Sequence, residues 1–210
     1  MSIEIKRSVK PVDYHDAIGL LEKRLEKLIN KKGKELIWFL EHDEIYTGGT
    51  SFNNKDILDK SIKVIKTSRG GKITHHSRGQ LICYFVIDLS KRNKDIRKFI
   101  VSIENSIIET FNEFKIYSQS DRKNIGIWVN HNNENKKVGA IGLRVKKWIA
   151  YHGFSINIYN DLSKFKKIVP CGLKDKKVIS LEHIAKINYL KFGKILEQKL
   201  IKNLSVSNYS

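Results

Sequence analysis

Two cysteines are present in this sequence of 210 residues, and their surroundings differ. Cys171 lies in IVPCGL (168–173), where Pro170 fixes the backbone before it and Gly172 frees the backbone after it. This pattern predicts a sharp turn that presents the thiol at a surface or cleft. Cys83 lies in the apolar run LICYFVIDL and is expected to be a small core residue. A thiol becomes a good nucleophile only beside a cation, a helix N-terminus or a base, so Cys171 would need a partner.

Lys137 is a candidate for that partner, because it opens the strand-like segment KVGAIGLRV. With a period of two, Lys137 is expected to share a face with Gly139, Ile141 and Leu143, while Val138 points the other way. A lysine among small and apolar side chains is partly removed from water, which suits proton transfer. The alternative is a lysine at the end of a strand that extends into solvent.

A glycine-containing basic segment, SRGGKITHHSRGQ (68–80), is the third candidate for chemistry. Gly70 and Gly71 allow the backbone to approach a ligand closely, and Arg69 and Lys72 supply positive charge. The segment matches neither a Walker loop nor a dinucleotide fingerprint, which argues against nucleotide binding. An ordinary flexible loop is the alternative.

The elements that must position these residues can be read from hydrophobic periodicity. Three segments have helical spacing: 12–32, which Asp13 can cap, 95–114 and 189–203. Buried or alternating strands are predicted at 35–42, 62–67, 81–89, 125–129, 137–145 and 148–158. A pair of lysines joins the last two, as in a hairpin. Strands in runs with a few helices between them predict an α+β or mixed α/β fold with a largely antiparallel sheet flanked by helices.

Composition limits the class of protein. We expect residues 1–210 to form one domain, because no repeat, linker or low-complexity block divides the chain. No apolar run is long enough to cross a membrane, and the first residues lack the apolar centre of a signal peptide, so a cytoplasmic protein is expected. The seven histidines and two cysteines show no zinc spacing, so no metal is expected. The net charge of +18 indicates an anionic partner or an A/T-rich genome, and it selects no partner by itself.

Six segments in order resemble the lipoyl(octanoyl) transferases. They span Glu41 to His183 and read EHDEIYTGG, SRGGKITHHSRGQ, GIWV, KVGAIGLRV, HGFSINI, and IVPCGL with ISLEH. The resemblance implies a fold similar to the catalytic domains of biotin protein ligases and lipoate-protein ligases. It also implies transfer of an octanoyl (or lipoyl) group from acyl carrier protein to a lysine of a lipoyl domain, as the first step of protein lipoylation.

The resemblance assigns residues as well. It implies that Cys171 is the nucleophile that carries the acyl group as a thioester and that Lys137, rather than Lys136, is its acid/base partner. The implied acyl pocket consists of Arg69, Gly70, Gly71, Lys72, Ile73, Thr74, His75 and His76, of Ala140, Ile141 and Gly142, and of Gly153, Phe154 and Ser155.

The sequence departs from the family pattern in two places. Ser77 and Arg78 stand where the family usually has glycine and proline, and Asp43 and Glu44 stand where prolines are usual. These changes bear on the shape of the pocket and leave the inferred nucleophile and its partner untouched.

The implied partners are octanoyl-acyl carrier protein as donor, and as acceptors the lipoyl domains of 2-oxoacid dehydrogenase E2 subunits and the glycine cleavage H protein. No cofactor is required, because the incoming thioester is already activated. One alternative is an ATP-dependent lipoate ligase, which would not need Cys171. The other is a basic nucleic-acid-binding module, but the aromatic residues Trp38, Phe85 and Trp128 lie in segments that look buried rather than exposed.

Overall fold

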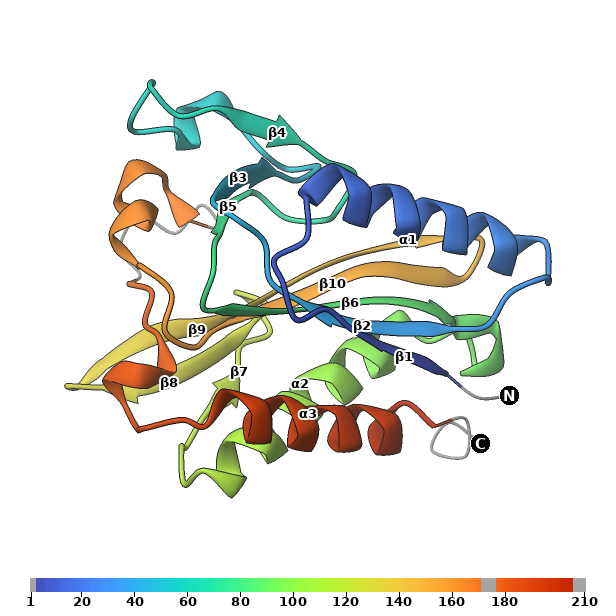
Figure 1. Ribbon diagram of the computed structural model, residues 1–210. Coiled ribbons are helices and arrows are strands. Elements are labelled where there is room, and N and C mark those ends of the chain that lie inside the picture. The colour runs from blue at the N-terminus through green and yellow to red at the C-terminus, as the bar shows by residue number, and fades with distance from the viewer. Residues whose placement is uncertain (1–2, 171–176, 206–210) are drawn as a thin grey trace.

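A seven-stranded sheet in the order β1-β2-β6-β10-β9-β8-β7 runs through the centre of the molecule, and a three-stranded sheet β4-β3-β5 lies at one end (Figure 1). The computed structural model describes residues 3–170 and 177–205. The strands of the large sheet are β1 (Glu4–Arg7), β2 (Leu36–Leu40), β6 (Gln80–Asp88), β7 (Gln119–Ser120), β8 (Ile127–His131), β9 (Glu134–Lys146) and β10 (Ile149–Asn157). The small sheet contains β3 (Ile45–Gly48), β4 (Val64–Lys66) and β5 (Ile73–His76). The helices are α1 (Tyr14–Ile29), α2 (Ile96–Glu113) and α3 (Tyr189–Asn203).

Antiparallel pairing dominates the large sheet, and among its strands in the described residues only β1 and β2 pair in parallel. Helix α1 covers one face, and α2 and α3 cover the other (Figure 1). Burial on both faces explains the continuous apolar sequence of β6, because its side chains alternate between two hydrophobic clusters. Cys83 and Phe85 pack on the side of α2 and α3, whereas Ile82 and Tyr84 pack on the side of α1.

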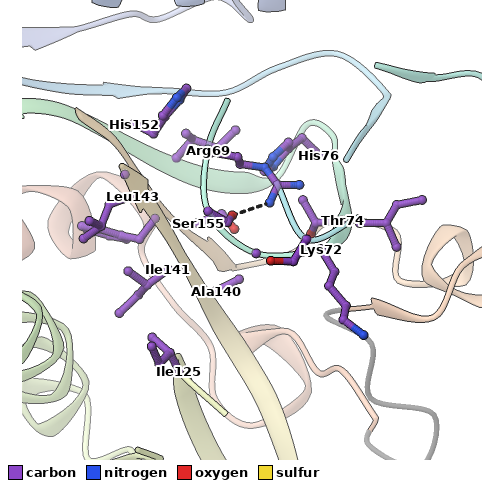
Figure 2. A pocket seen from close by; sticks show the side chains of 18 of the residues that line it. Arg69, Lys72, Thr74, His76, Ile125, Ala140, Ile141, Leu143, His152 and Ser155 are labelled. Carbon is purple, nitrogen blue, oxygen red and sulfur yellow. Dashed lines mark hydrogen bonds between the residues drawn. The ribbon is translucent and has the colours of Figure 1, made fainter. Parts of the chain in front are cut away.

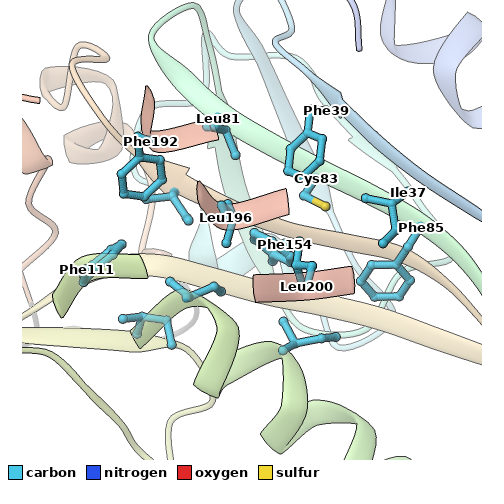
Figure 3. Close-up of a cluster of buried hydrophobic side chains, with 14 of the residues drawn as sticks. Ile37, Phe39, Leu81, Cys83, Phe85, Phe111, Phe154, Phe192, Leu196 and Leu200 are labelled. Atoms are coloured by element: carbon cyan, nitrogen blue, oxygen red, sulfur yellow. The ribbon is translucent and has the colours of Figure 1, made fainter. Parts of the chain in front are cut away.

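The hydrophobic cluster between the sheet and helices α2 and α3 is the larger of the two. Phe99, Ile103, Ile107 and Phe111 recur at helical spacing on α2 and are fully buried. Figure 3 shows Phe111 of α2 and Phe192, Leu196 and Leu200 of α3 meeting side chains of β2, β6 and β10. These contacts fix the face of the sheet that lies away from α1.

Helix α1 begins as the sequence predicts. The Asp13 carboxylate accepts hydrogen bonds from the backbone N–H groups of His15 and Asp16 at 2.8 and 3.1 Å. Ala17, Leu21, Leu25 and Leu28 then form the buried stripe against the sheet.

The fold class and all nine predicted helices and strands are confirmed, with ends that shift by a few residues. The glycine-containing segment is not a loop throughout, which was the alternative for residues 68–80, because Ile73–His76 forms β5 and pairs with β3. The prediction that a pair of lysines forms the hairpin turn is wrong in one residue. The hairpin turn is made by Lys147 and Trp148, which have positive φ angles of 48° and 62°, and the strand begins only at Ile149. That residues 1–210 form one domain stays a prediction.

Candidate active site

A cavity of about 440 Å³ lies where the glycine-containing segment crosses strands β9 and β10. The backbone N–H of Gly70 donates to the carbonyl oxygen of Leu143 at 3.2 Å, which joins the segment to β9. A Cβ atom at Gly70 would lie 2.8 Å from that same oxygen, and one at Gly142 would lie 3.2 Å from the carbonyl oxygen of Gly70. Glycine at both positions therefore permits the close crossing that forms this wall of the cavity.

Nearly all residues of the predicted acyl pocket line this one cavity. They are Arg69, Gly70, Gly71, Lys72, Ile73, Thr74, His76, Ala140, Ile141, Gly142, Gly153, Phe154 and Ser155. His75 does not line it, because its ring lies between those of Tyr46 and Phe165. In Figure 2 the side chains of Arg69, His76 and His152 gather at one end of the pocket, and Ile125, Ile141 and Leu143 lie toward the other.

Arg69 has a role in shaping the cavity that the sequence did not indicate. Its guanidinium donates to the Thr47 carbonyl oxygen at 2.6 Å, to the Thr47 hydroxyl at 2.9 Å and to the Gly70 carbonyl oxygen at 3.0 Å. These bonds tie the glycine-containing segment to β3. The Arg69 guanidinium therefore stabilises this wall of the cavity through hydrogen bonds.

Lys137 is buried, with 7% of its surface exposed, and it lines the cavity. Val138 points away from Lys137, as predicted, but the prediction that Lys137 shares a face with Gly139 is wrong. Gly139 lies opposite Ile127 and Lys137 opposite Trp128, so Val138 is an extra residue in β9, a β-bulge that breaks the alternation. Val138 consequently packs in the hydrophobic cluster of α2 and α3, whereas the Lys137 ammonium lies 5.3 Å from the centre of the Trp128 ring.

Cys171 lies outside the described residues, so its predicted role stays a prediction. Pro170, the residue before it, lines a small cavity of about 20 Å³ together with Lys137 and Ser155. Cys83 is fully buried in β6, as predicted, and burial raises the pKa of its thiol well above the ordinary value. Cys83 is therefore a poor nucleophile.

Buried histidines surround the polar end of the cavity and are held neutral. Burial lowers the pKa of His76 to about 3, and Gln80 Oε1 lies 2.6 Å from its Nδ1. Burial, with Arg69 and Arg144 nearby, lowers the pKa of His152 to about 4. His152 also has a φ angle of +71° in the middle of β10, and its Nε2 lies 3.0 Å from the Ser68 hydroxyl. Its ring thus contacts the start of the glycine-containing segment.

Several residues that line the cavity were not predicted from the sequence. Tyr14 comes from α1 and Tyr84 from β6, while Lys123, Asn124 and Ile125 precede β8. Other liners that were not predicted are Ser51, Ile82, Ile100, Leu143 and His152. Ile125 and Leu143 lie in segments that the sequence predicts as strands, and His152 begins the family-like motif HGFSINI. Nothing near Tyr14 or Ile100 in the sequence indicates a place in the cavity, because both have the spacing of ordinary helix residues.

The departures from the family pattern contact one another. Arg78 Nε lies 2.6 Å from a carboxylate oxygen of Asp43, and both side chains are exposed. Lys164 Nζ lies 3.0 Å from a carboxylate oxygen of Glu44. None of these four residues lines the main cavity. The two unusual segments therefore form a surface ion pair outside it.

Within residues 3–170 and 177–205, no group of three or more histidine, cysteine or acidic side chains is arranged to hold a metal ion. Over the same part of the chain, no helix is both long and apolar enough to cross a membrane.

Comparisons with solved structures show the fold. A structure of the lipoylation system of Thermoplasma acidophilum, with a bi-partite lipoate protein ligase, superposes with a TM-score of 0.73 at 13% identity, covering 97% of this chain and 84% of that chain. Lipoate-protein ligase A bound with ATP gives a TM-score of 0.72 at 13% identity, covering 96% and 85%. The biotin protein ligase of Aquifex aeolicus gives 0.52 at 14% identity, covering 99% and 74%. The predicted likeness to both kinds of ligase fold is confirmed.

Sequence comparisons show the family. The family described as "Lipoyl protein ligase A/B catalytic domain" matches residues 13–201. An octanoyltransferase of Ehrlichia chaffeensis (strain ATCC CRL-10679 / Arkansas) is 41% identical over 211 residues, covering 99% of this chain and 98% of the relative. An octanoyltransferase of Wolbachia pipientis wMel is 39% identical over 193 residues, covering 91% and 94%. The chain therefore belongs to the lipoyl protein ligase A/B catalytic domain family, within the group of the octanoyltransferases.

Proposed function

We propose that this protein transfers an octanoyl group from octanoyl-acyl carrier protein to a lysine of a lipoyl domain, through a thioester on Cys171 with Lys137 as acid/base partner. The observation that carries the proposal is the cavity of about 440 Å³, because it unites the glycine-containing segment, β9, β10 and the buried Lys137. Its walls are largely apolar, as an acyl chain requires, and polar groups gather at one end.

In the first half-reaction protonated Lys137 stabilises the Cys171 thiolate, which attacks the thioester carbonyl carbon. A new carbon–sulfur bond forms, the bond to the carrier sulfur breaks, and the carrier leaves as a thiol after taking a proton from Lys137. The tetrahedral oxyanion needs backbone N–H donors. The N–H of Gly70 is already bonded to Leu143, so the donors must come from other groups.

In the second half-reaction the amine of the acceptor lysine attacks the Cys171 thioester and Lys137 accepts its proton. The amide forms and the Cys171 thiol is regenerated. The acceptors we propose are lipoyl domains of 2-oxoacid dehydrogenase E2 subunits and the glycine cleavage H protein. Acidic carrier and lipoyl domains suit a chain with a net charge of +18, and their association should weaken as salt rises. A cytoplasmic location belongs to the same proposal.

The test is incubation with octanoyl-acyl carrier protein without ATP, followed by intact mass spectrometry. We expect an octanoyl adduct that hydroxylamine removes, that Cys171→Ser abolishes and that passes to a lipoyl domain. Lys137→Ala should slow both steps. Cys83→Ser is the matched cysteine control and should keep the adduct, because Cys83 is buried in the core. Labelling of the lipoyl domain only with ATP and free octanoate or lipoate would overturn the proposal in favour of a ligase.

A further inference from the structure

A turn from Asp121 to Gly126 lies against Lys137. We infer that this turn, through Gly126, positions Lys137 for acyl transfer. The inference rests on the proposed function, in which Lys137 moves the proton. It makes Gly126 a positioning residue, since it acts through Lys137 and not on the substrate.

The end of the Lys137 side chain is held from two sides. Its ammonium donates a hydrogen bond to the carbonyl oxygen of Ile125 at 2.8 Å. It also lies 5.3 Å from the centre of the Trp128 ring, within the range of a cation–π contact. A lysine has three N–H donors on a flexible stem, so fixing one of them narrows the directions of the others.

Gly126 provides the space in which Lys137 lies. Its φ angle is +142°, a conformation that residues with side chains rarely adopt. A Cβ atom there would lie 2.4 Å from Lys137 Cε and 3.0 Å from Nζ. It would also lie 2.5 Å from the carbonyl oxygen of Gly139, which belongs to the β9 backbone. A larger residue would therefore displace the lysine, because the lysine is the most flexible of these neighbours.

The turn itself is anchored by hydrogen bonds. The Asp121 carboxylate accepts from the backbone N–H groups of Lys123 and Asn124 at 2.8 and 3.2 Å, and from the Asn124 side-chain amide at 2.8 Å. The Trp128 indole N–H donates to the Asn124 carbonyl oxygen at 3.0 Å. The Ile125 carbonyl that accepts the Lys137 hydrogen bond thus belongs to a turn stabilised by its own hydrogen bonds.

The same turn forms part of the cavity wall. Lys123, Asn124 and Ile125 line the cavity beside Lys137, and Ile125 is 45% exposed. The residue that accepts the lysine hydrogen bond therefore also contributes a side chain to the acyl pocket. This placement keeps the lysine at a fixed position relative to the bound acyl group.

The test compares Gly126→Ala with Asp121→Ala, a milder variant that removes the carboxylate whose hydrogen bonds hold the turn. The measurement is the single-turnover rate of Cys171 acylation by octanoyl-acyl carrier protein. We expect Gly126→Ala to slow the maximal rate by about 10- to 100-fold, the size of effect that misplacement by about 1 Å produces. Asp121→Ala should slow it severalfold, and the donor concentration at half-maximal rate should change little in both. Gly19→Ala is the matched control, because a Cβ there meets no atom within 4 Å.

A double-mutant cycle with Lys137→Ala separates positioning from general damage. If the turn acts through Lys137, adding Gly126→Ala or Asp121→Ala to Lys137→Ala should cost no further rate. Losses that multiply, or wild-type rates in both single variants, would overturn the inference while the proposed function stands. A wild-type rate for Lys137→Ala itself would instead refute the acid/base role of Lys137. If Gly126→Ala fails to fold, the double-mutant cycle is measured with Asp121→Ala and Lys137→Ala only.

Discussion

Alternate side chains of strand β10 enter two different environments. Ala150 and Ile156 pack in the hydrophobic cluster with helices α2 and α3, and Phe154 packs there while it also lines the cavity. On the other face Gly153 and Ser155 line the cavity. The first environment is filled by apolar side chains, and the second leaves space and carries polar groups.

The cavity face also contains polar contacts that cost free energy to bury. The Gln80 amide donates to Asn157 Oδ1 at 2.8 Å and to the His75 carbonyl oxygen at 3.3 Å, and its Oε1 lies 2.6 Å from His76 Nδ1. On the side of α2 and α3, Asn203 donates hydrogen bonds to Ser106 and Glu109, each at 3.2 Å, but none of these three residues lines the cavity. One face of the sheet therefore packs a hydrophobic core, and the other face forms the cavity. Four substitutions test this division.

Phe99→Ala should have the largest effect, and on stability alone. Phe99 is fully buried and its ring lies 5.4 Å from that of Phe85 in an edge-on contact. Its truncation should lower the free energy of unfolding by about 3 to 5 kcal/mol. Urea unfolding measures this loss. The acylation rate per folded molecule should match the wild type below the transition, and a large fall in that rate would contradict the division between the faces.

His75→Phe should alter how stability depends on pH. Burial lowers the pKa of His75 to about 4 from the ordinary 6.5, and neither ring nitrogen has a hydrogen-bond partner among the described residues. The unfolded chain takes up a proton as the pH falls below about 6.5, while folded His75 stays neutral until about pH 4. His75 therefore destabilises the folded state progressively across that interval.

Replacing His75 by phenylalanine removes this proton uptake on unfolding. Relative to the wild type, the variant should gain about 2 kcal/mol of unfolding free energy between pH 7.5 and pH 4.5. Urea unfolding at both pH values measures the gain. His15→Phe, at an exposed position of α1, serves as control and should give no such gain. An equal gain in the control would show that the effect does not arise from burial of His75.

Gly49→Ala should affect the site more than the core. A Cβ atom at Gly49 would lie 2.4 Å from the Gly71 carbonyl oxygen and 2.8 Å from that of Gly70, so the glycine-containing segment must shift. We expect the acylation rate to fall by about 10-fold or more, because the segment forms a wall of the cavity. The acylation rate would be measured by quenching the reaction at set times and recording the intact mass of the protein. Gly193→Ala, whose nearest contact would be 3.9 Å, should keep the wild-type rate.

Arg78→Ala should have the smallest effect. The ion pair with Asp43 joins two side chains that are each 70% exposed, and such surface pairs contribute little to stability. We expect neither the urea midpoint nor the acylation rate to change measurably. A clear loss of rate would show that the departure from the family pattern at Ser77 and Arg78 does shape the pocket.

The amino-acid sequence was sufficient to predict the family, the fold class, the main helices and strands, and many but not all of the residues that line the cavity. It could do so because helix and strand periods are local, and because six motifs in order are specific even where each alone is weak. Burial of Cys83 in β6 followed from the same patterns, whereas the pattern around Lys137 left a solvent-directed side chain as an alternative.

Only the tertiary structure decided which way several of these residues face. The bulge at Val138 places Lys137 and Gly139 on opposite faces, and a bulge exists only relative to the neighbouring strand β8. The positive φ of His152, the fit of Gly126 against Lys137 and the pairing of Arg78 with Asp43 likewise depend on residues far away in the chain or on a single backbone angle. A period of two or 3.6 residues carries no information about such contacts, because they form between segments only after each has folded against the others.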